Sequence, residues 1–214
     1  MAIPLEKRLR KRLHAETAML QDEVMDTLYS IENKLVLHGG TAIWRCYGGN
    51  RFSEDLDFYC KDIHEIERQL NKKINERGLV LQKFKKTENL VFCKISNGTV
   101  EVRVEINFAV DKRAVARQYE KADGSLMDVF TLSEEELILE KISAYEARKF
   151  IRDIYDVYYL SGHIKDNSKV QNRLKKALLI LPEPVDESNL RVLLYSGAML
   201  SFSQIAESLK RRFL

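Results

Sequence analysis

Two aspartates one residue apart, Asp55 and Asp57, carry the clearest chemical signature in this 214-residue chain. They lie in the run DLDFY, whose alternation of polar and apolar residues is typical of a half-buried strand. Side chains alternate along a strand, so both carboxylates project to one face. Adjacent like charges are costly, and a hard divalent cation such as Mg²⁺ would neutralise them while keeping positions open for phosphate oxygens. The pair therefore predicts a metal site.

A glycine pair and a hydroxyl residue, Gly39, Gly40 and Thr41, precede the acids by about fourteen positions. Glycines allow close backbone approach, and the amides that open the following helix bind phosphate with help from the helix dipole. Thr41 adds a hydroxyl that can donate to the same group. A phosphate cradle, a hydroxyl and an acid pair together predict a nucleoside triphosphate site.

A third carboxylate would complete the metal site, and the run EVRVEINF at residues 101–108 offers one. The run alternates strictly, so Glu101, Arg103, Glu105 and Asn107 share one face. Glu105 is our choice because it lies mid-strand, where the apolar pattern is strongest. Glu101 stays the alternative.

The periodicity of the first half predicts an α/β arrangement around these residues. A helical stripe covers residues 4–29, and Asn97-Gly98 is a strong hairpin signal between two β-prone runs. Residues 112–130 are mixed and are expected to form a connector. The other expected elements are strands at 34–37, 55–59, 79–84, 90–95 and 100–110, a short helix after the glycine pair, and a helix at 63–77.

The second half predicts helices alone. Ser133 with Glu136 forms a capping box ahead of a long helical pattern. Helices are expected at 134–148, 151–163, 168–181, 187–195 and 201–212. We therefore expect an α/β domain with an N-terminal helix at residues 1–130 and a helical domain at residues 131–214.

The composition excludes several classes of protein. No apolar run approaches the roughly 20 residues that span a bilayer, and the basic N-terminus lacks the apolar core of a secretory signal. Three widely spaced cysteines fit neither a disulfide framework nor a zinc site. We expect a cytoplasmic protein with reduced thiols and no membrane association. The net charge of +3 is too small to identify a partner, although basic clusters lie at residues 7–12 and 210–212.

The two motifs together resemble a known family. Residues 39–42 read GGTA and residues 51–58 read RFSEDLDF, similar to the signature of polymerase-β-type nucleotidyltransferases. More narrowly, the chain resembles the AbiEii/AbiGii abortive-infection toxins, the nucleotidyltransferase half of type IV toxin–antitoxin pairs. Glu140-Lys141, Ala144, Arg148 and the run RDIYD at 152–156 resemble that family's lysine motif and its Arg-Asp-x-x-Asp motif.

The resemblance implies a fold and an activity. The fold is an α/β (α+β) polymerase-β-like nucleotidyltransferase core with a mixed sheet, followed by an all-helical half. The activity is transfer of a nucleotide monophosphate from a nucleoside triphosphate, dependent on Mg²⁺ or Mn²⁺, with pyrophosphate release. RNA, and tRNA in some relatives, is the implied acceptor, and an antitoxin encoded nearby is the implied partner. A protein-modifying, AMP-adding transferase and a non-catalytic nucleotide- or partner-binding module on the same fold stay as alternatives.

The resemblance also assigns residues. Asp55, Asp57 and Glu105 would hold the metal and act in catalysis, and Lys141 would contact the triphosphate. Taken alone, Arg51 is expected to face phosphate or solvent, and Ser53 to cap a turn or hold the acid pair. Arg152 and Asp156, four apart on a helix, also fit an ordinary salt bridge. The remaining assignments are nucleotide binding by Gly39, Gly40, Thr41, Arg51 and Ser53, and support by Arg148, Arg152, Asp153 and Asp156.

Overall fold

The structure, a computed structural model, describes residues 3–61, 66–108 and 113–214. The chain divides into two compact units. One comprises Met1–Cys46 and Phe52–Leu132, and the other comprises Tyr47–Arg51 and Ser133–Leu214. The short segment 47–51 thus belongs with the C-terminal helices although it lies between two elements of the first unit. The chain consequently passes between the units at 46/47, 51/52 and 132/133.

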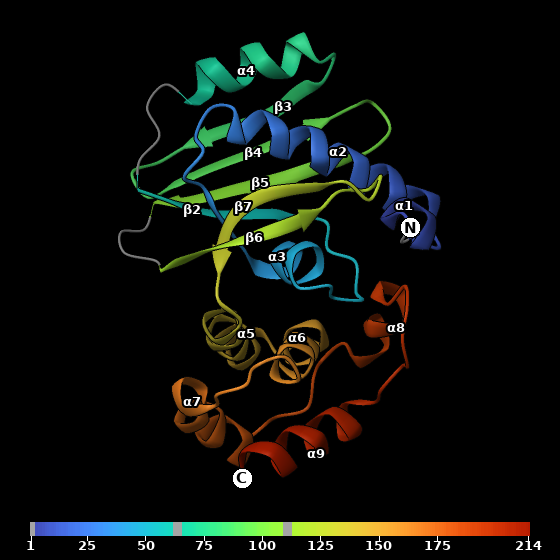
Figure 1. The fold of residues 1–214 in the computed structure, drawn as a ribbon, viewed down its shortest axis with the longest axis vertical. Helices are drawn as coiled ribbons and strands as arrows, with labels where there is room; N and C mark the ends of the chain where they lie inside the picture. The colour runs from blue at the N-terminus through green and yellow to red at the C-terminus, as the bar shows by residue number, and fades with distance from the viewer. Residues whose placement is uncertain (1–2, 62–65, 109–112) are drawn as a thin grey trace. The chain divides into compact units, whose positions relative to one another are not determined.

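Within the described residues, the first unit holds a seven-stranded mixed sheet in the order β3-β4-β5-β2-β1-β7-β6 (Figure 1). β1 pairs parallel with β7 and β2 parallel with β5, and the other neighbours are antiparallel. The strands are β1 Val36–His38, β2 Leu56–Cys60, β3 Val80–Lys86, β4 Leu90–Ser96, β5 Glu101–Phe108, β6 Ala114–Glu120 and β7 Leu126–Leu132. The helices of this unit are α1 Leu5–Arg8, α2 Arg12–Tyr29, α3 Gly39–Cys46 and α4 Ile66–Glu76.

The two faces of the sheet differ in burial. Leu56, Phe58 and Cys60 of β2 are buried, whereas Asp57 and Tyr59 between them are partly exposed. β5 alternates in the same way, with its apolar side chains buried under α2. Figure 1 shows α2 and α4 lying side by side across this buried face. The polar residues of the acid motifs therefore share the opposite, more exposed face, as the alternation predicts.

A buried arginine fixes α3 to the same face as α2. Arg45 of α3 is 2% exposed and donates to Ala18 O at 3.0 Å, Asp22 Oδ1 at 2.5 Å and Tyr119 Oη at 3.0 Å. Tyr119 of β6 donates in turn to Asp22 of α2 at 3.1 Å, and the Ala122 amide donates to Asp22 at 2.6 Å. Burial raises the pKa of Asp22 although Arg45 opposes the shift. One guanidinium thus joins two helices and an edge strand.

The predicted helix over residues 4–29 is broken, so its continuity was wrongly predicted. Leu9 is extended, with ψ near 126°, and the chain re-enters a helix at Arg12. The break lets both Leu5 and Leu9 become buried, and the Glu6 amide donates to Ala122 O at 2.9 Å. Tertiary contact outweighs local helix propensity here.

The prediction of a connector at residues 112–130 was also wrong. Its described part forms the hairpin β6–β7, and residue 112 lies outside the described residues together with 109–111. β7 pairs parallel with β1, with Val36 opposite Phe130, across more than 90 residues of sequence. Since the pairing of β7 depends on a strand so far away in the sequence, the local sequence pattern predicts this strand only weakly.

The second unit is helical, as predicted. Ser133 accepts the Glu136 amide at the start of α5, and Ser201 with Gln204 forms a full capping box at the start of α9. The expected helix at 187–195 is instead a 3₁₀ turn and a single short helix. Among residues 3–61, 66–108 and 113–214, no helix has the length and apolar character of a transmembrane span. The helices are α5 Glu134–Arg148, α6 Ile151–Ser161, α7 Ser168–Leu179, the 3₁₀ turn Glu187–Asn189, α8 Leu190–Leu193 and α9 Phe202–Phe213.

Substituting Arg45→Met should destabilise the first unit by about 3 kcal/mol, because Asp22 would stay buried without its cation. Urea denaturation followed by circular dichroism measures the loss. Arg12→Met is the control, since Arg12 pairs with Glu16 on the exposed helix surface and is expected to cost less than about 0.5 kcal/mol. Equal effects of the two substitutions would contradict the role of Arg45.

Candidate active site

The predicted site residues fall into two clusters, one in each unit. The first unit holds Gly39, Gly40, Thr41, Ser53, Asp55, Asp57 and Glu105. The second unit holds Arg51, Lys141, Arg148, Arg152, Asp153 and Asp156.

The strand register brings two of the predicted acids side by side. Asp57 of β2 lies opposite Glu105 of β5 in parallel register, and opposite His38 of β1 on its other side. Residues paired across neighbouring strands face the same way at about 4.8 Å between strands. Asp57 and Glu105 are therefore adjacent members of one row on the exposed face, although 48 residues separate them in sequence.

The first residue of α3 lies against the acid site. Gly39 has φ of +71°, and a Cβ at this position would lie 2.7 Å from Oδ2 of Asp57. A side chain at this position would displace the Asp57 carboxylate, and the backbone conformation itself favours glycine. The sequence requirement for Gly39 thus follows from its contact with Asp57, and the start of α3 is held beside this carboxylate.

The Thr41 hydroxyl is already engaged. Thr41 is fully buried, and its Oγ1 donates to the carbonyl oxygen of Asp55 at 2.5 Å. The hydroxyl thus ties α3 to the chain that carries the acid pair. Direct contact of Thr41 with a nucleotide stays a prediction.

Sequence reasoning missed Gln21, which holds the turn before the acid pair. Its side chain is fully buried in α2, and Nε2 donates to Ser53 O at 2.9 Å and to Glu54 O at 3.0 Å. The available signal was a glutamine lying within the apolar stripe of a helix. The predicted role of Ser53, to cap a turn or to hold the acid pair, stays a prediction.

Arg103, also missed, supplies a positive charge within the acid cluster. Its Nη2 lies 2.6 Å from Oδ2 of Asp55, and its Nε lies 3.8 Å from Oε1 of Glu105. Alternation along β5 had placed Arg103 on the same face as Glu105, which was the signal for this contact. The guanidinium offsets the repulsion between carboxylates that the sequence indicated.

The acids fit a divalent cation by chemistry. Asp57 of β2 and Glu105 of β5, on one face of two neighbouring strands, offer the carboxylate oxygens that Mg²⁺ and Mn²⁺ prefer. Asp55 adds a third carboxylate directly before β2, which begins at Leu56 and not at Asp55 as predicted. Within the described part of the chain, however, no three acidic, histidine or cysteine side chains already form a group able to hold a metal. The carboxylate of Asp55 instead pairs with Arg103. Metal binding would require that ion pair to open.

Arg51 lies in a buried ion pair in the second unit. It is 5% exposed, and its Nε and Nη2 donate to the two carboxylate oxygens of Asp156 at 2.7 and 2.6 Å. Burial alone would raise the pKa of Asp156, but Arg51 and Lys141 outweigh burial and hold this pKa below its usual range. Nucleotide binding by Arg51 stays a prediction.

Lys141 extends this network. Its Nζ lies 2.9 Å from Asp156 and 3.4 Å from Asp153, and Arg148 donates to Asp153 through Nε at 2.7 Å. The cations of Arg51, Lys141 and Arg148 thus surround the two buried carboxylates. The Arg148 side chain is 41% exposed, so the network reaches the surface there. The predicted contact between Lys141 and a triphosphate is not tested by this geometry.

The spacing of Arg152 and Asp156 allows a salt bridge along α6, but the structure places the Arg152 guanidinium beside an aromatic ring. Asp156 pairs with Arg51 and Lys141, and the Arg152 guanidinium carbon lies 5.5 Å from the ring centre of Phe150. A supporting role for Arg152 in the site stays a prediction.

Tyrosines hold the segment 47–51 within the second unit. Tyr155 of α6 donates to Asn50 Oδ1 at 2.6 Å, and Tyr195 donates to Gly49 O at 2.7 Å. The sequence gives no local signal for these contacts, because the partners of the two hydroxyl groups are more than 100 positions away. The segment 47–51, a few residues before the acid pair, is therefore anchored by Tyr155 of α6 and by Tyr195, which follows α8.

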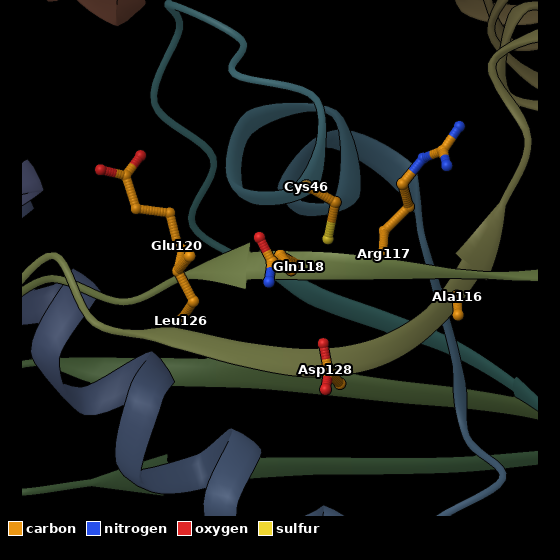
Figure 2. A pocket seen from close by; sticks show the side chains of 7 residues that line it. All are labelled: Cys46, Ala116, Arg117, Gln118, Glu120, Leu126 and Asp128. Atoms are coloured by element: carbon orange, nitrogen blue, oxygen red, sulfur yellow. The ribbon is translucent and has the colours of Figure 1, made fainter.

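A cavity of about 540 Å³ beside edge strand β6 lies apart from the predicted residues. Figure 2 shows the side chains of Cys46, at the end of α3, and of the β6–β7 hairpin. Burial raises the pKa of the Cys46 thiol to about 12, so this thiol is a poor nucleophile at neutral pH. The lining residues are Cys46, Ala116, Arg117, Gln118, Glu120, Leu126 and Asp128.

Comparison with protein families identifies one match. The model of the family described as "Nucleotidyl transferase AbiEii toxin, Type IV TA system" matches residues 26–182. This range includes both clusters and exceeds half of the chain. Comparison with curated proteins gives no significant match.

Solved structures with a similar fold include three bacterial proteins. JHP933 from Helicobacter pylori is 21% identical, with 91% of this chain and 89% of that chain covered and a TM-score of 0.63. A putative nucleotidyltransferase from H. pylori is 22% identical, with 91% and 92% covered and a TM-score of 0.61. MenT4, a nucleotidyltransferase toxin from Mycobacterium tuberculosis H37Rv, is 19% identical, with 94% and 82% covered and a TM-score of 0.62. The predicted fold class is confirmed.

Substituting Asp156→Asn should make stability less dependent on pH. The folded pKa of Asp156 lies below the unfolded value of about 3.9, so its ionised form stabilises the fold above that pH. This stabilisation is lost as the pH falls through the folded pKa. We expect the variant to be about 3 kcal/mol less stable at pH 7, and the difference to narrow toward pH 3, in urea titrations across that range.

Asp123→Asn is the control for this experiment. Hydrogen bonds from Ser125 lower the pKa of Asp123 as well, but this carboxylate lies on the surface. Asp123→Asn should therefore change the stability much less than Asp156→Asn at pH 7, and its small effect should also narrow as the pH falls. A difference between wild type and Asp156→Asn that stays constant with pH would contradict the assigned ion pairing.

Proposed function

Since this chain belongs to the AbiEii family of nucleotidyltransferase toxins, we propose that it transfers a nucleotide monophosphate from a nucleoside triphosphate to RNA, with tRNA as the first candidate acceptor. Family membership makes it a nucleotidyltransferase, and the acceptor, the metal and the residue roles are our proposal. The observation that supports them most is the row formed by Asp57 and Glu105, with Gly39 against the Asp57 carboxylate.

The residues of the first-unit cluster suit both the triphosphate of the nucleotide and the acceptor hydroxyl. Asp55, Asp57 and Glu105 would hold Mg²⁺ or Mn²⁺, which supplies positive charge to the triphosphate and lowers the pKa of the acceptor hydroxyl. The amides of Gly39 and Gly40 open α3 beside Asp57, where a helix N-terminus favours phosphate. The hydrogen bond from the Thr41 hydroxyl to the Asp55 carbonyl holds α3 beside the acid pair. The hydrogen bond from Gln21 to the Ser53 carbonyl holds the segment 53–55 to α2.

The transfer itself exchanges one phosphorus–oxygen bond for another. The oxygen of the acceptor hydroxyl forms a bond to the α-phosphorus, while the bond from that phosphorus to the bridging oxygen breaks. Pyrophosphate leaves with the electron pair, and the hydroxyl proton passes to a carboxylate. Glu105 is the residue we assign as the base, because it is partly exposed and adjacent to Asp57 in the row.

The second-unit cluster suits an anion. It gathers the cations of Arg51, Lys141 and Arg148, and the Arg148 side chain is 41% exposed. We assign Lys141 to the leaving pyrophosphate, with Asp153, Asp156 and Arg51 as the residues that orient it. As a toxin of this family, the protein would act in the cytoplasm and be countered by an antitoxin encoded nearby.

Asp57→Asn tests the catalytic assignment. We expect nucleotide incorporation to fall by at least about 100-fold, because a metal-binding carboxylate is lost. The assay incubates the purified protein with each α-labelled nucleoside triphosphate, Mg²⁺ and total RNA, and measures label on RNA. Asp128→Asn, an exposed aspartate on β7 of the same sheet, is the matched control and should retain activity.

The location of the label decides among the alternatives. Label on protein would support an AMP-adding enzyme, and tight nucleotide binding without transfer would support a non-catalytic module. Persistent transfer by Asp57→Asn would refute the site. Expression of the wild type in cells should arrest growth, whereas Asp57→Asn should not.

Arg103→Ala tests the metal site without measuring turnover. Removing the cation that pairs with Asp55 should strengthen Mn²⁺ binding about tenfold, or ~1.4 kcal/mol, in a titration followed by electron paramagnetic resonance. Lys94→Ala is the control, because Lys94 pairs with Glu101 on the same face. Unchanged Mn²⁺ binding by Arg103→Ala would indicate that the acids do not share a cation site with Arg103.

A further inference from the structure

The row that contains the acids continues across two more strands. Glu105 of β5 lies opposite Phe92 of β4, and Phe92 lies opposite Lys85 of β3. Asp57, Glu105, Phe92 and Lys85 therefore share one face of four neighbouring strands. At about 4.8 Å per strand, Lys85 lies on a strand about 14 Å from that of Asp57.

The neighbouring row adds further cations. Arg103 of β5 lies opposite Lys94 of β4, which lies opposite Lys83 of β3. Lys83 and Lys85 are exposed, and the Lys83 ammonium lies 5.2 Å from the ring centre of Phe92. Phe92 is itself partly exposed, unlike the apolar residues that flank it in β4. The ring and the two ammonium groups thus form one exposed patch.

The residues that β3 and β4 contribute to this face include several lysines and no acidic residue. They are Val80, Lys83, Lys85, Leu90, Phe92, Lys94 and Ser96. The acids begin one strand further on, at β5. The face is therefore divided into an acidic end beside α3 and a basic, aromatic end at the sheet edge.

We propose that Lys83, Lys85 and Phe92 bind the RNA strand that carries the acceptor hydroxyl, an inference that rests on the proposed function. The lysines would contact phosphates and the ring would stack on a base, the combination that single-stranded nucleic acids bind. A strand whose terminal hydroxyl reaches Glu105 and Asp57 would extend over this patch. At about 3.4 Å per stacked nucleotide, 14 Å corresponds to about four nucleotides.

The order of the strands separates this patch from the nucleoside triphosphate. The glycines of α3 follow β1, on the side of Asp57 away from β5. Along the row, the expected phosphate cradle therefore comes first, then Asp57 and Glu105, then Phe92 and Lys85. The two substrates would approach the acids from opposite directions, as in-line transfer requires.

The double variant Lys83→Ala/Lys85→Ala tests the proposal. Binding of a fluorescent single-stranded RNA to the full-length protein, measured by anisotropy, should weaken at least tenfold. The slope of log K against log salt should also fall by about 1.4, since each lost phosphate contact contributes about 0.7. Binding of ATP with Mg²⁺ should stay unchanged, and Lys83→Arg/Lys85→Arg should retain RNA binding.

Lys72→Ala/Arg77→Ala is the matched control, because it removes two exposed charges at α4, against the opposite face of the sheet. An equal loss of RNA binding in this control, or unchanged binding in Lys83→Ala/Lys85→Ala, would refute the proposal that the patch binds RNA. So would transfer by the wild type to protein alone. The proposed function is judged separately by Asp57→Asn, so an active enzyme with an RNA site elsewhere remains distinguishable from an inactive one. Thermal unfolding of each variant checks that the fold is intact.

Discussion

The parallel register between β2 and β5 is the constraint on which the acid site depends. It sets Asp57 opposite Glu105 on the exposed face, and it sets Leu56 opposite Val104 in the core. A slip of one residue would carry the acids into the apolar layer and expose the apolar side chains. The hydrophobic core thus enforces the alignment of the carboxylates, and no contact between the carboxylates is needed to create it.

The two units compensate their buried or closely spaced charges in different ways. In the first, a single guanidinium, that of Arg103, compensates carboxylates that would otherwise repel one another. In the second, the buried carboxylates of Asp153 and Asp156 pair with Arg51, Lys141 and Arg148. The small net charge of +3 hides both arrangements, because it sums the charges of the whole chain and carries no information on where they cluster. The distribution of charge along strands and helices is what relates to function.

The sequence was sufficient to predict the strands that carry the acids, the face that they share, the glycine turn and the helical second half. These features depend on local periodicity and on residues close in sequence. The partner of Arg51, the two hydrogen bonds of Gln21 and the pairing of β7 with β1 could not be predicted, because each joins segments far apart in the chain. The break between α1 and α2 escaped for the same reason, since its cause is a contact with Ala122.

Because segment 47–51 belongs to the second unit, recombination cannot exchange one unit without affecting the other. Five residues inserted in the first unit's sequence are structurally part of the second, where Arg51 and Asn50 meet Asp156 and Tyr155. The units are therefore not interchangeable modules joined by a linker. A recombination event at residue 132 that exchanged one helical unit for another would preserve both hydrophobic cores and still leave a buried arginine without its carboxylate. The two halves must therefore change together during evolution, and their sequences should covary at these contacts.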